Sequence, residues 1–199
     1  GFKGSWLSLW LKQLGAKVTG VSLDIPTKPS LYETSKLQLE NDKRLDIVDL
    51  VHIKDLLLEI KPDFLFHLAA QPIVRKSFSD PLKTWMTNTI GTVNLLESLR
   101  NLENECSAIF ITSDKCYQNN EWKWGYREND RLGGDDPYSA SKASAEIAIK
   151  SYYESYLKKN TNLRIGICRA GNVIGGGDWA QDRLIPDCVR SWTNNQNVL

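Results

Sequence analysis

The sequence has few residues that could bind a metal ion. Its 199 residues include only two histidines and four cysteines, which are Cys106, Cys116, Cys168 and Cys188. The cysteines are widely spaced and no C-x-x-C pair occurs, so the pattern does not indicate a zinc site. We expect no bound metal, and we expect the cysteines to be buried free thiols in a reducing cytosol.

The sequence also lacks an excess of charge and a long apolar run. It carries 25 Lys and Arg against 24 Asp and Glu, a formal net charge of +1, which gives no general electrostatic reason to bind nucleic acid or an acidic membrane. Apolar stretches such as Trp6 to Leu11 are too short to span a bilayer, and no secretory leader is recognisable. We therefore expect a cytoplasmic protein without a nucleic-acid or membrane partner.

What the sequence does contain is a regular alternation of strand-like and helix-like segments. β-Branched or continuous apolar runs predict strands at 16–23, 44–47, 63–70, 107–112 and 163–169. Apolar residues at helical spacing predict helices at 5–14, 51–61, 81–102, 138–158 and 184–192. This alternation favours an α/β fold with a doubly wound parallel sheet of the Rossmann type.

A glycine turn opens the first predicted helix. Gly1-Phe2-Lys3-Gly4 precedes that helix, and the next predicted strand closes on Asp24, 20 residues after Gly4. In a dinucleotide-binding βαβ unit, glycines let the backbone approach a pyrophosphate at a helix N-terminus, and an acid at this interval accepts ribose hydroxyls. Asp24 would repel a 2′-phosphate, which favours NAD over NADP. The preceding strand and the first glycine of the fingerprint are absent, and a lone Gly-x-x-Gly also opens ordinary helices.

A Tyr-x-x-x-Lys pair lies in the stretch from Asp135 to Glu146. Pro137 suits the first turn of a helix, which places Tyr138 and Lys142 four residues apart on one face. A phenol has a reference pKa near 10, and a cation about 6 Å away lowers it by roughly 2 pH units at an effective dielectric near 20. Lys142 would thus activate Tyr138 as a base. An ordinary surface helix that carries this spacing by chance is the alternative.

Polar residues follow the strand predicted at 107–112. Ser113, Asp114 and Lys115 stand at its carboxyl end, where ligands lie in parallel α/β sheets. The polar residues 118–136 predict a long loop that could reach over a site. His67 stands in an apolar run and is expected to be a hydrogen-bonded core residue, whereas Asp46 is equally well an adenine contact or a solvated turn residue.

Together these segments resemble extended short-chain dehydrogenases/reductases of the nucleotide-sugar-modifying group. The resemblance covers nearly the whole chain and rests on the order and spacing of its motifs: Gly1-Phe2-Lys3-Gly4, Asp24, His67-Leu68-Ala69-Ala70, Asn88-Thr89-Ile90-Gly91-Thr92, Thr112-Ser113-Asp114-Lys115, Tyr138-x-x-x-Lys142 and Arg169-Ala170-Gly171-Asn172. Within the group, the 4,6-dehydratases that act on CDP-glucose are most similar over Ser113-Asp114-Lys115-Cys116-Tyr117, Gly175-Gly176-Gly177-Asp178-Trp179 and Asp182-Arg183-Leu184-Ile185-Pro186.

The resemblance implies a set of site residues. The catalytic residues would be Ser113, Asp114, Lys115, Tyr138 and Lys142. NAD would contact Tyr138 and Lys142, together with Gly1, Phe2, Gly4, Asp24, Asp46, Ile47, Leu68, Ala69 and Ala70. Asn172 and Arg183 would bind the sugar diphosphate, with a surface salt bridge as the alternative for Arg183, and Asn88 is expected to brace the active-site loop.

In the implied reaction, Tyr138 takes the proton of the sugar 4-hydroxyl while the C4 hydride passes to NAD, and Ser113 hydrogen-bonds the same oxygen. Asp114 then protonates the 6-hydroxyl as water leaves, and the hydride returns to C6. Related dehydratases carry Glu where this chain has Lys115, which can remove the C5 proton only as a neutral amine. A cation that pairs with Asp114 or with the substrate phosphate is the alternative for Lys115.

The resemblance also implies that residues 1–168 form an NAD-binding domain without its first strand, and that 169–199 begin a substrate-binding region. We expect a fragment that lacks most of that region, because the chain starts at Gly1 without Met and stops in an Asn-rich segment. A homodimer or homotetramer is expected, with the helices at 81–102 and 138–158 as contact faces. The alternatives are a UDP-sugar 4-epimerase, another nucleotide-sugar dehydratase, and a non-catalytic dinucleotide-binding module.

Overall fold

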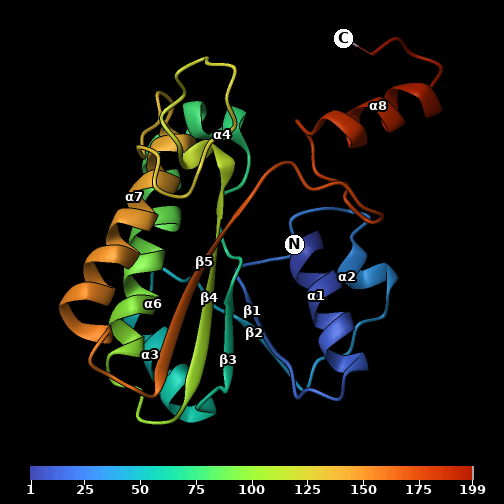
Figure 1. Ribbon diagram of the computed structural model, residues 1–199. Helices are drawn as coiled ribbons and strands as arrows, with labels where there is room; N and C mark the ends of the chain where they lie inside the picture. The colour runs from blue at the N-terminus through green and yellow to red at the C-terminus, as the bar shows by residue number, and fades with distance from the viewer. Residues whose placement is uncertain (199) are drawn as a thin grey trace. The chain divides into compact units, whose positions relative to one another are not determined.

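A computed structural model describes residues 1–198 of the chain (Figure 1). The chain divides into two compact units. Unit 1 comprises Gly1–Leu45 and residues 172–198, and unit 2 comprises Asp46–Gly171. The predicted NAD-binding domain at 1–168 and the predicted start of a substrate-binding region at 169–199 are divisions by function, and both stay predictions.

Unit 2 is built on a three-stranded parallel sheet. Its strands are β3 (Phe64–His67), β4 (Cys106–Ser113) and β5 (Leu163–Ala170), in the order β3-β4-β5. Helices α3 (Leu50–Ile60), α6 (Gly91–Leu99) and α7 (Pro137–Tyr152) cover one face of this sheet (Figure 1). Parallel pairing and helical crossovers confirm the predicted α/β class.

The core of unit 2 lies between the sheet and these helices. Phe110 of β4, Leu96 and Leu99 of α6, and Ile149 of α7 are almost completely buried. Gly91 lets α6 approach the segment before α3, because a Cβ at this position would come within 2.5 Å of Ile47 Cδ1. Apolar burial therefore fixes both the sheet and the helices that follow its strands.

The two long predicted helices each contain a π-helical turn, which interrupts the first and ends the second. The segment predicted at 81–102 consists of α5 (Pro81–Trp85), the π-helical turn η1 (Met86–Ile90) and α6. The segment predicted at 138–158 consists of α7 followed by η3 (Tyr153–Leu157), which is also π-helical. The sequence analysis also missed the short helix α4 (Val74–Ser79), because a single helical turn leaves no periodic pattern to read.

Unit 1 contains a two-stranded parallel sheet and three helices. Its strands are β1 (Thr19–Ser22) and β2 (Asn41–Arg44), and its helices are α1 (Phe2–Gln13), α2 (Leu31–Thr34) and α8 (Leu184–Thr193). The strand predicted at 44–47 was therefore misplaced, since β2 ends where that prediction begins. The chain turns after β2 because Asp46 Oδ1 accepts a hydrogen bond from Val48 N at 3.0 Å.

Two features are not found in the part of the chain that the structure describes. Among residues 1–198, no helix has the length and apolar character needed to cross a membrane. In the same part of the chain, no three His, Cys, Asp or Glu side chains come together as a metal site. Cys106, Cys116 and Cys188 are buried free thiols as predicted, but Cys168 is exposed, because β5 lies at the edge of its sheet and has several exposed positions.

Candidate active site

The start of α7 is fixed by local contacts. Asp136 caps the helix, since its Oδ1 accepts hydrogen bonds from Tyr138 N at 2.9 Å and from Ser139 N at 3.0 Å. Pro137 occupies the first turn, as the sequence predicts. Gly134 lies against this turn so closely that a Cβ would stand 2.5 Å from the backbone nitrogen of Ala140. The first turn of α7 therefore has little freedom to shift.

Tyr138 and Lys142 are both buried on the inner face of α7. Tyr138 is 8% exposed and Lys142 is 7% exposed, so neither lies on the solvent face of α7. Lys142 Nζ lies 3.5 Å from the carbonyl oxygen of Ile111, a residue of β4. The predicted base and its lysine therefore lie on the side of α7 that packs against β4 and the turn that follows it.

Ser113 and Asp114 are joined at the carboxyl end of β4. Ser113 is the last residue of the strand, and the 3-10 turn η2 (Asp114–Cys116) follows it. Ser113 Oγ donates a hydrogen bond to Asp114 Oδ1 at 3.1 Å and accepts one from Lys115 N at 3.2 Å. A Cβ on Gly171, which follows β5, would lie 3.6 Å from Asp114 Oδ2. The carboxyl group thus stands over the ends of two neighbouring strands.

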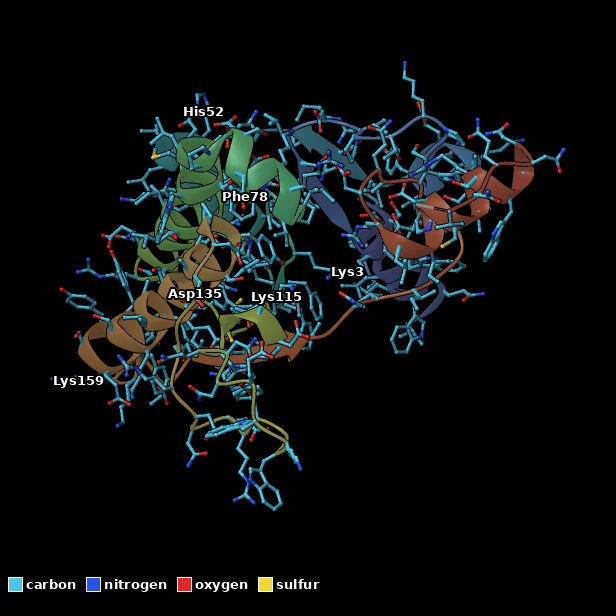
Figure 2. All side chains as sticks on the ribbon, turned by 90° about the horizontal axis from the view of Figure 1, so that it is seen from above. Lys3, His52, Phe78, Lys115, Asp135 and Lys159 are labelled. Carbon is cyan, nitrogen blue, oxygen red and sulfur yellow. The ribbon has the colours of Figure 1, made fainter. Side chains whose placement is uncertain are left out.

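Lys115 is exposed beside Asp114, and in the described part of the chain the two form no ion pair. The two interpretations of Lys115, as the C5 base or as a cation for Asp114 or the substrate phosphate, both stay predictions. In Figure 2, Lys115 lies close to Asp135, the residue just before the cap of α7. A hydrogen bond of 2.9 Å from Gly133 N to Cys116 O joins the same two segments. The strand end and the helix start therefore belong to one site region.

His67 is the hydrogen-bonded core residue that the sequence predicts. Its Nε2 lies 3.0 Å from Thr92 Oγ1. The Thr92 hydroxyl already donates to Asn88 O at 2.7 Å, so Nε2 carries the proton and donates to Thr92. Burial lowers the pKa of His67 to about 3, with the charge of Lys142 as a second cause. His67 is therefore neutral at pH 7.

Asn88 joins the segment after β3 to α7, and its predicted role at the active-site loop stays a prediction. Its Oδ1 accepts from Gln71 N at 2.8 Å, and its Nδ2 donates to Gln71 O at 3.2 Å and to Ser141 Oγ at 2.9 Å. Ser141 Oγ in turn donates to Tyr138 O at 2.7 Å. Gln71 also donates to Thr84 Oγ1 at 2.9 Å. The sequence analysis missed Gln71, Thr84 and Ser141, whose only signal was their closeness in sequence to the motifs.

Unit 2 also contains two segments whose residues were predicted to contact NAD: Asp46 with Ile47, and residues 68–70. Asp46 is exposed and its side chain closes the turn to Val48, as the turn alternative predicts. Ile47 is buried, with its side chain against Gly91. Residues 68–70 are partly buried directly after β3. Their contacts with NAD stay predictions.

The sequence analysis did not predict the polar cluster formed by Glu146, Thr112 and Arg169. Glu146, one turn beyond Lys142, accepts hydrogen bonds from Thr112 Oγ1 at 2.6 Å and from Arg169 Nε at 2.9 Å. Burial raises the pKa of Glu146, but the hydrogen bonds from Arg169, Thr112 and Cys116 outweigh it and leave the pKa below its usual value. The available signal was the repeat of four residues from Tyr138 through Lys142 to Glu146 on one helix face.

In unit 1, α1 begins directly after Gly1, and Asp24 follows two residues after the end of β1. A Cβ on Gly1 or Gly4 would meet no atom within 4 Å, so the space beside the turn is open. This arrangement fits a diphosphate beside the turn and a ribose near Asp24.

The predicted substrate residues also lie in unit 1. Arg183 Nη1 lies 3.2 Å from Asp178 Oδ2, so the salt bridge named as the alternative is present. The guanidinium carbon of Arg183 stands 6.0 Å from the centre of the Phe2 ring. Burial lowers the pKa of Lys3, and the charge of Arg183 lowers it further, so two cations gather beside the glycine turn. Asn172 is exposed at the start of the second segment of this unit.

The chain matches a known family model over almost its whole length. The model describes GDP-mannose 4,6 dehydratase and matches residues 1–195. The CDP-glucose 4,6-dehydratase of Salmonella typhimurium is 50% identical over 100% of this chain. The chain spans 57% of the length of that relative.

Solved structures of similar fold include two 4-epimerases. The UDP-glucose 4-epimerase of Thermus thermophilus, solved with NAD, is 26% identical over 90% of this chain and 55% of its own, with a TM-score of 0.74. The UDP-glucuronic acid 4-epimerase of Bacillus cereus, solved with UDP-glucuronic acid and NAD, reaches a TM-score of 0.83 over 98% of this chain and 61% of its own. At 24% identity, the second likeness supports the fold alone.

Proposed function

We propose a function that proceeds from one premise: this chain belongs to the GDP-mannose 4,6-dehydratase family. It forms the NAD-binding part of a nucleotide-sugar 4,6-dehydratase that converts CDP-glucose to CDP-4-keto-6-deoxyglucose and water. The observation that carries the choice of CDP-glucose is the identity to the Salmonella enzyme along the whole chain. The arrangement of unit 2 supports the chemistry, because a buried Tyr-Lys pair packs beside a Ser-Asp pair at a strand end.

NAD, when bound, would accept the hydride from C4 of the hexose and return it at C6. The residues that would hold it are Asp24 at the ribose, the Gly1–Gly4 turn at the diphosphate, and Tyr138 and Lys142 at the nicotinamide end. The open space beside the glycine turn supports this fit. A carboxylate at Asp24 favours NAD over a cofactor with a 2′-phosphate.

Tyr138 takes the proton from the 4-hydroxyl, and Lys142 stabilises the resulting phenolate charge. Ser113 hydrogen-bonds the same sugar oxygen. Once C4 is a ketone, the C5 proton becomes acidic and can be removed by Lys115 in its neutral form. Asp114, when protonated, donates a proton to the 6-hydroxyl, which leaves as water. Lys115 then returns its proton to C5, so that the product keeps a hydrogen there. Ser113, hydrogen-bonded to Asp114 at 3.1 Å, helps to orient that carboxyl group.

The test is turnover of the complete protein with CDP-, dTDP-, UDP- and GDP-linked hexoses. We expect CDP-glucose to react fastest and to give a 4-keto-6-deoxy sugar, detected by its chromophore in alkali. Inversion at C4 without a keto product would support the 4-epimerase alternative instead. Cofactor binding without turnover of any nucleotide sugar would leave the non-catalytic binding module.

A second experiment separates oxidation at C4 from dehydration. Lys115→Met should keep hydride removal at C4 and lose release of water, because Met cannot take the C5 proton. Tyr138→Phe should reduce both steps by about 100- to 10,000-fold, the usual contribution of a general base. Full dehydration by Lys115→Met would rule out Lys115 as the base and leave it as a cation for the substrate phosphate.

Self-association is part of the proposal. Exposed apolar side chains lie along the two helical segments that were predicted as contact faces: Leu82, Trp85, Ile90, Ile147 and Tyr156. Burying such side chains in a symmetric interface would remove apolar area from water. Sedimentation of the complete protein should show a dimer or a tetramer, and Ile147→Asp should shift it towards the monomer. An unchanged oligomer with Ile147→Asp would show that this face is not the contact.

A further inference from the structure

A buried ion pair holds α7 to two strands of unit 2. The side chains of Glu146 and Arg169 are 2% and 17% exposed. Glu146 accepts hydrogen bonds from Arg169 Nε at 2.9 Å through both carboxylate oxygens, and from Thr112 Oγ1 at 2.6 Å. Arg169 belongs to β5 and Thr112 to β4. One carboxylate on α7 is therefore bound to both neighbouring strands.

Arg169 also holds the long loop that precedes α7. Its Nη1 donates to Glu128 O at 3.0 Å, and its guanidinium carbon lies 4.5 Å from the centre of the Tyr117 ring. Tyr117 stacks on Tyr126 of the same loop, with 5.0 Å between the ring centres. Only a planar guanidinium can make the bidentate contact, the carbonyl contact and the ring contact at once.

The carboxylate stands on the same face of α7 as the predicted base. Tyr138, Lys142 and Glu146 follow one another at intervals of four residues, and all three are buried. An α-helix behaves as a stiff rod over two turns. Whatever fixes the rotation of α7 at Glu146 therefore also fixes where Tyr138 and Lys142 stand relative to the end of β4.

We propose that Glu146 and Arg169 are positioning residues, which set the rotation of α7 so that Lys142 and the phenol of Tyr138 face the substrate together with Ser113. The catalytic part of this inference rests on the proposed function; the positioning part does not. Displacement of a reacting group by about 1 Å costs on the order of 100-fold in rate. The loss should therefore appear in kcat rather than in KM.

The experiment compares wild type, Glu146→Gln and the double variant Glu146→Gln/Arg169→Met in the complete protein. The double variant removes both charges together, which avoids leaving one buried charge unpaired. We expect about 100-fold lower kcat with CDP-glucose in each, with KM changed by less than about threefold. The double variant should lose no more activity than Glu146→Gln alone, because both substitutions break the same contact.

The second readout does not depend on turnover. The tyrosinate absorbance of each protein, minus that of its Tyr138→Phe counterpart, gives the titration of Tyr138 alone. We expect Tyr138 to titrate at higher pH when the pair is removed, because Lys142 no longer stabilises the phenolate. If no nucleotide sugar is turned over by wild type, the proposed function fails, but this titration still decides the positioning claim.

Glu97→Gln is the matched control. Glu97 also binds an arginine through both carboxylate oxygens, with Arg100 Nη1 at 2.8 Å from each, but this pair is partly exposed on the same unit. It should change neither kcat nor the Tyr138 titration. A folded double variant with the kcat and Tyr138 titration of wild type would overturn the inference. A rise in KM alone would overturn it as well, because the pair would then act on substrate binding.

Discussion

Helices α7 and α1 both carry predicted site residues, yet they are held in different ways. α7 has a capping aspartate, a proline in its first turn and eight buried residues. α1 starts at Phe2 and has no side-chain cap, and of its residues only Ser5 is buried. Its large apolar side chains Trp6 and Trp10 are exposed.

The two helices are also proposed to do different things. α7 presents side chains, and a base must be held to within a fraction of an ångström to act. α1 would present its first backbone N–H groups to a diphosphate, a role that needs an open helix end and small residues. Within this chain, the helix with dense side-chain packing is the one for which side-chain chemistry is proposed.

The largest expected effect tests the difference in burial directly. Phe110→Ala in β4 should lower the free energy of unfolding by about 3–5 kcal/mol, because Phe110 is fully buried. Trp10→Ala in α1 should change it by less than about 0.5 kcal/mol, since that ring is 63% exposed. Urea denaturation followed by circular dichroism measures both. Equal losses would show that α1 is packed as tightly as the core of unit 2.

The next effect is a pH dependence confined to unit 2, which holds both histidines of the chain. The pKa of His67 is about 3 when folded and near 6.5 when unfolded. Above pH 6.5 the imidazole is neutral in both states and contributes nothing. Below it, only the unfolded state gains the proton, so stability should fall by about 1.4 kcal/mol per pH unit.

Urea titrations between about pH 5 and 7 measure this slope. His67→Gln keeps a donor for Thr92 but cannot titrate, so it should remove most of the slope. His52→Gln is the control, because His52 is exposed. If the pH dependence of stability persists in His67→Gln, titratable groups other than His67 cause it.

A smaller effect concerns the helix cap. Asp136→Ala should cost about 1 kcal/mol, because it leaves the N–H groups of Tyr138 and Ser139 without their acceptor. Asp136→Ser should recover most of the loss, since a serine oxygen can accept the same bonds. Thermal unfolding of the three proteins measures this. α1 has no capping side chain to remove. A capping residue introduced before α1 would test whether the N–H groups of its first turn must stay free for the proposed diphosphate.

The smallest effect is expected at the surface. Lys158 and Glu154 form an ion pair of 2.9 Å with both side chains more than half exposed. Water and salt screen such a pair, so Glu154→Gln should leave the urea midpoint unchanged. A clear shift would mean that the end of this helical segment is packed more firmly than its exposure indicates.

The sequence pattern predicted unit 2 better than unit 1. Apolar runs locate β3, β4 and β5 because these strands are covered by helices. β2 has the sequence Asn-Asp-Lys-Arg and is exposed throughout, so no apolar pattern could locate it. Its hydrogen bonds to β1 come from the backbone, which any residue can supply.

In the candidate site, too, some residues could be predicted from the sequence and others could not. Tyr138, Lys142 and Ser113 stand in short motifs and could be selected from the sequence alone. The supporting contacts could not, because they join polar residues far apart in the chain: Asn88 with Ser141, 53 residues apart, and Glu146 with Arg169, 23 apart. No periodicity links such pairs.

The π-helical turn Met86–Ile90 carries a consequence for chain length. Such a turn holds one residue more than an α-helical turn, so the helix beyond it is out of phase by about 100° with the helix before it. Deleting one residue here would restore a continuous α-helix and swing Asn88 away from Gln71 and Ser141. The number of residues in this stretch, as much as their identity, encodes the brace, and a one-residue gap in a homologue would mark a differently assembled site.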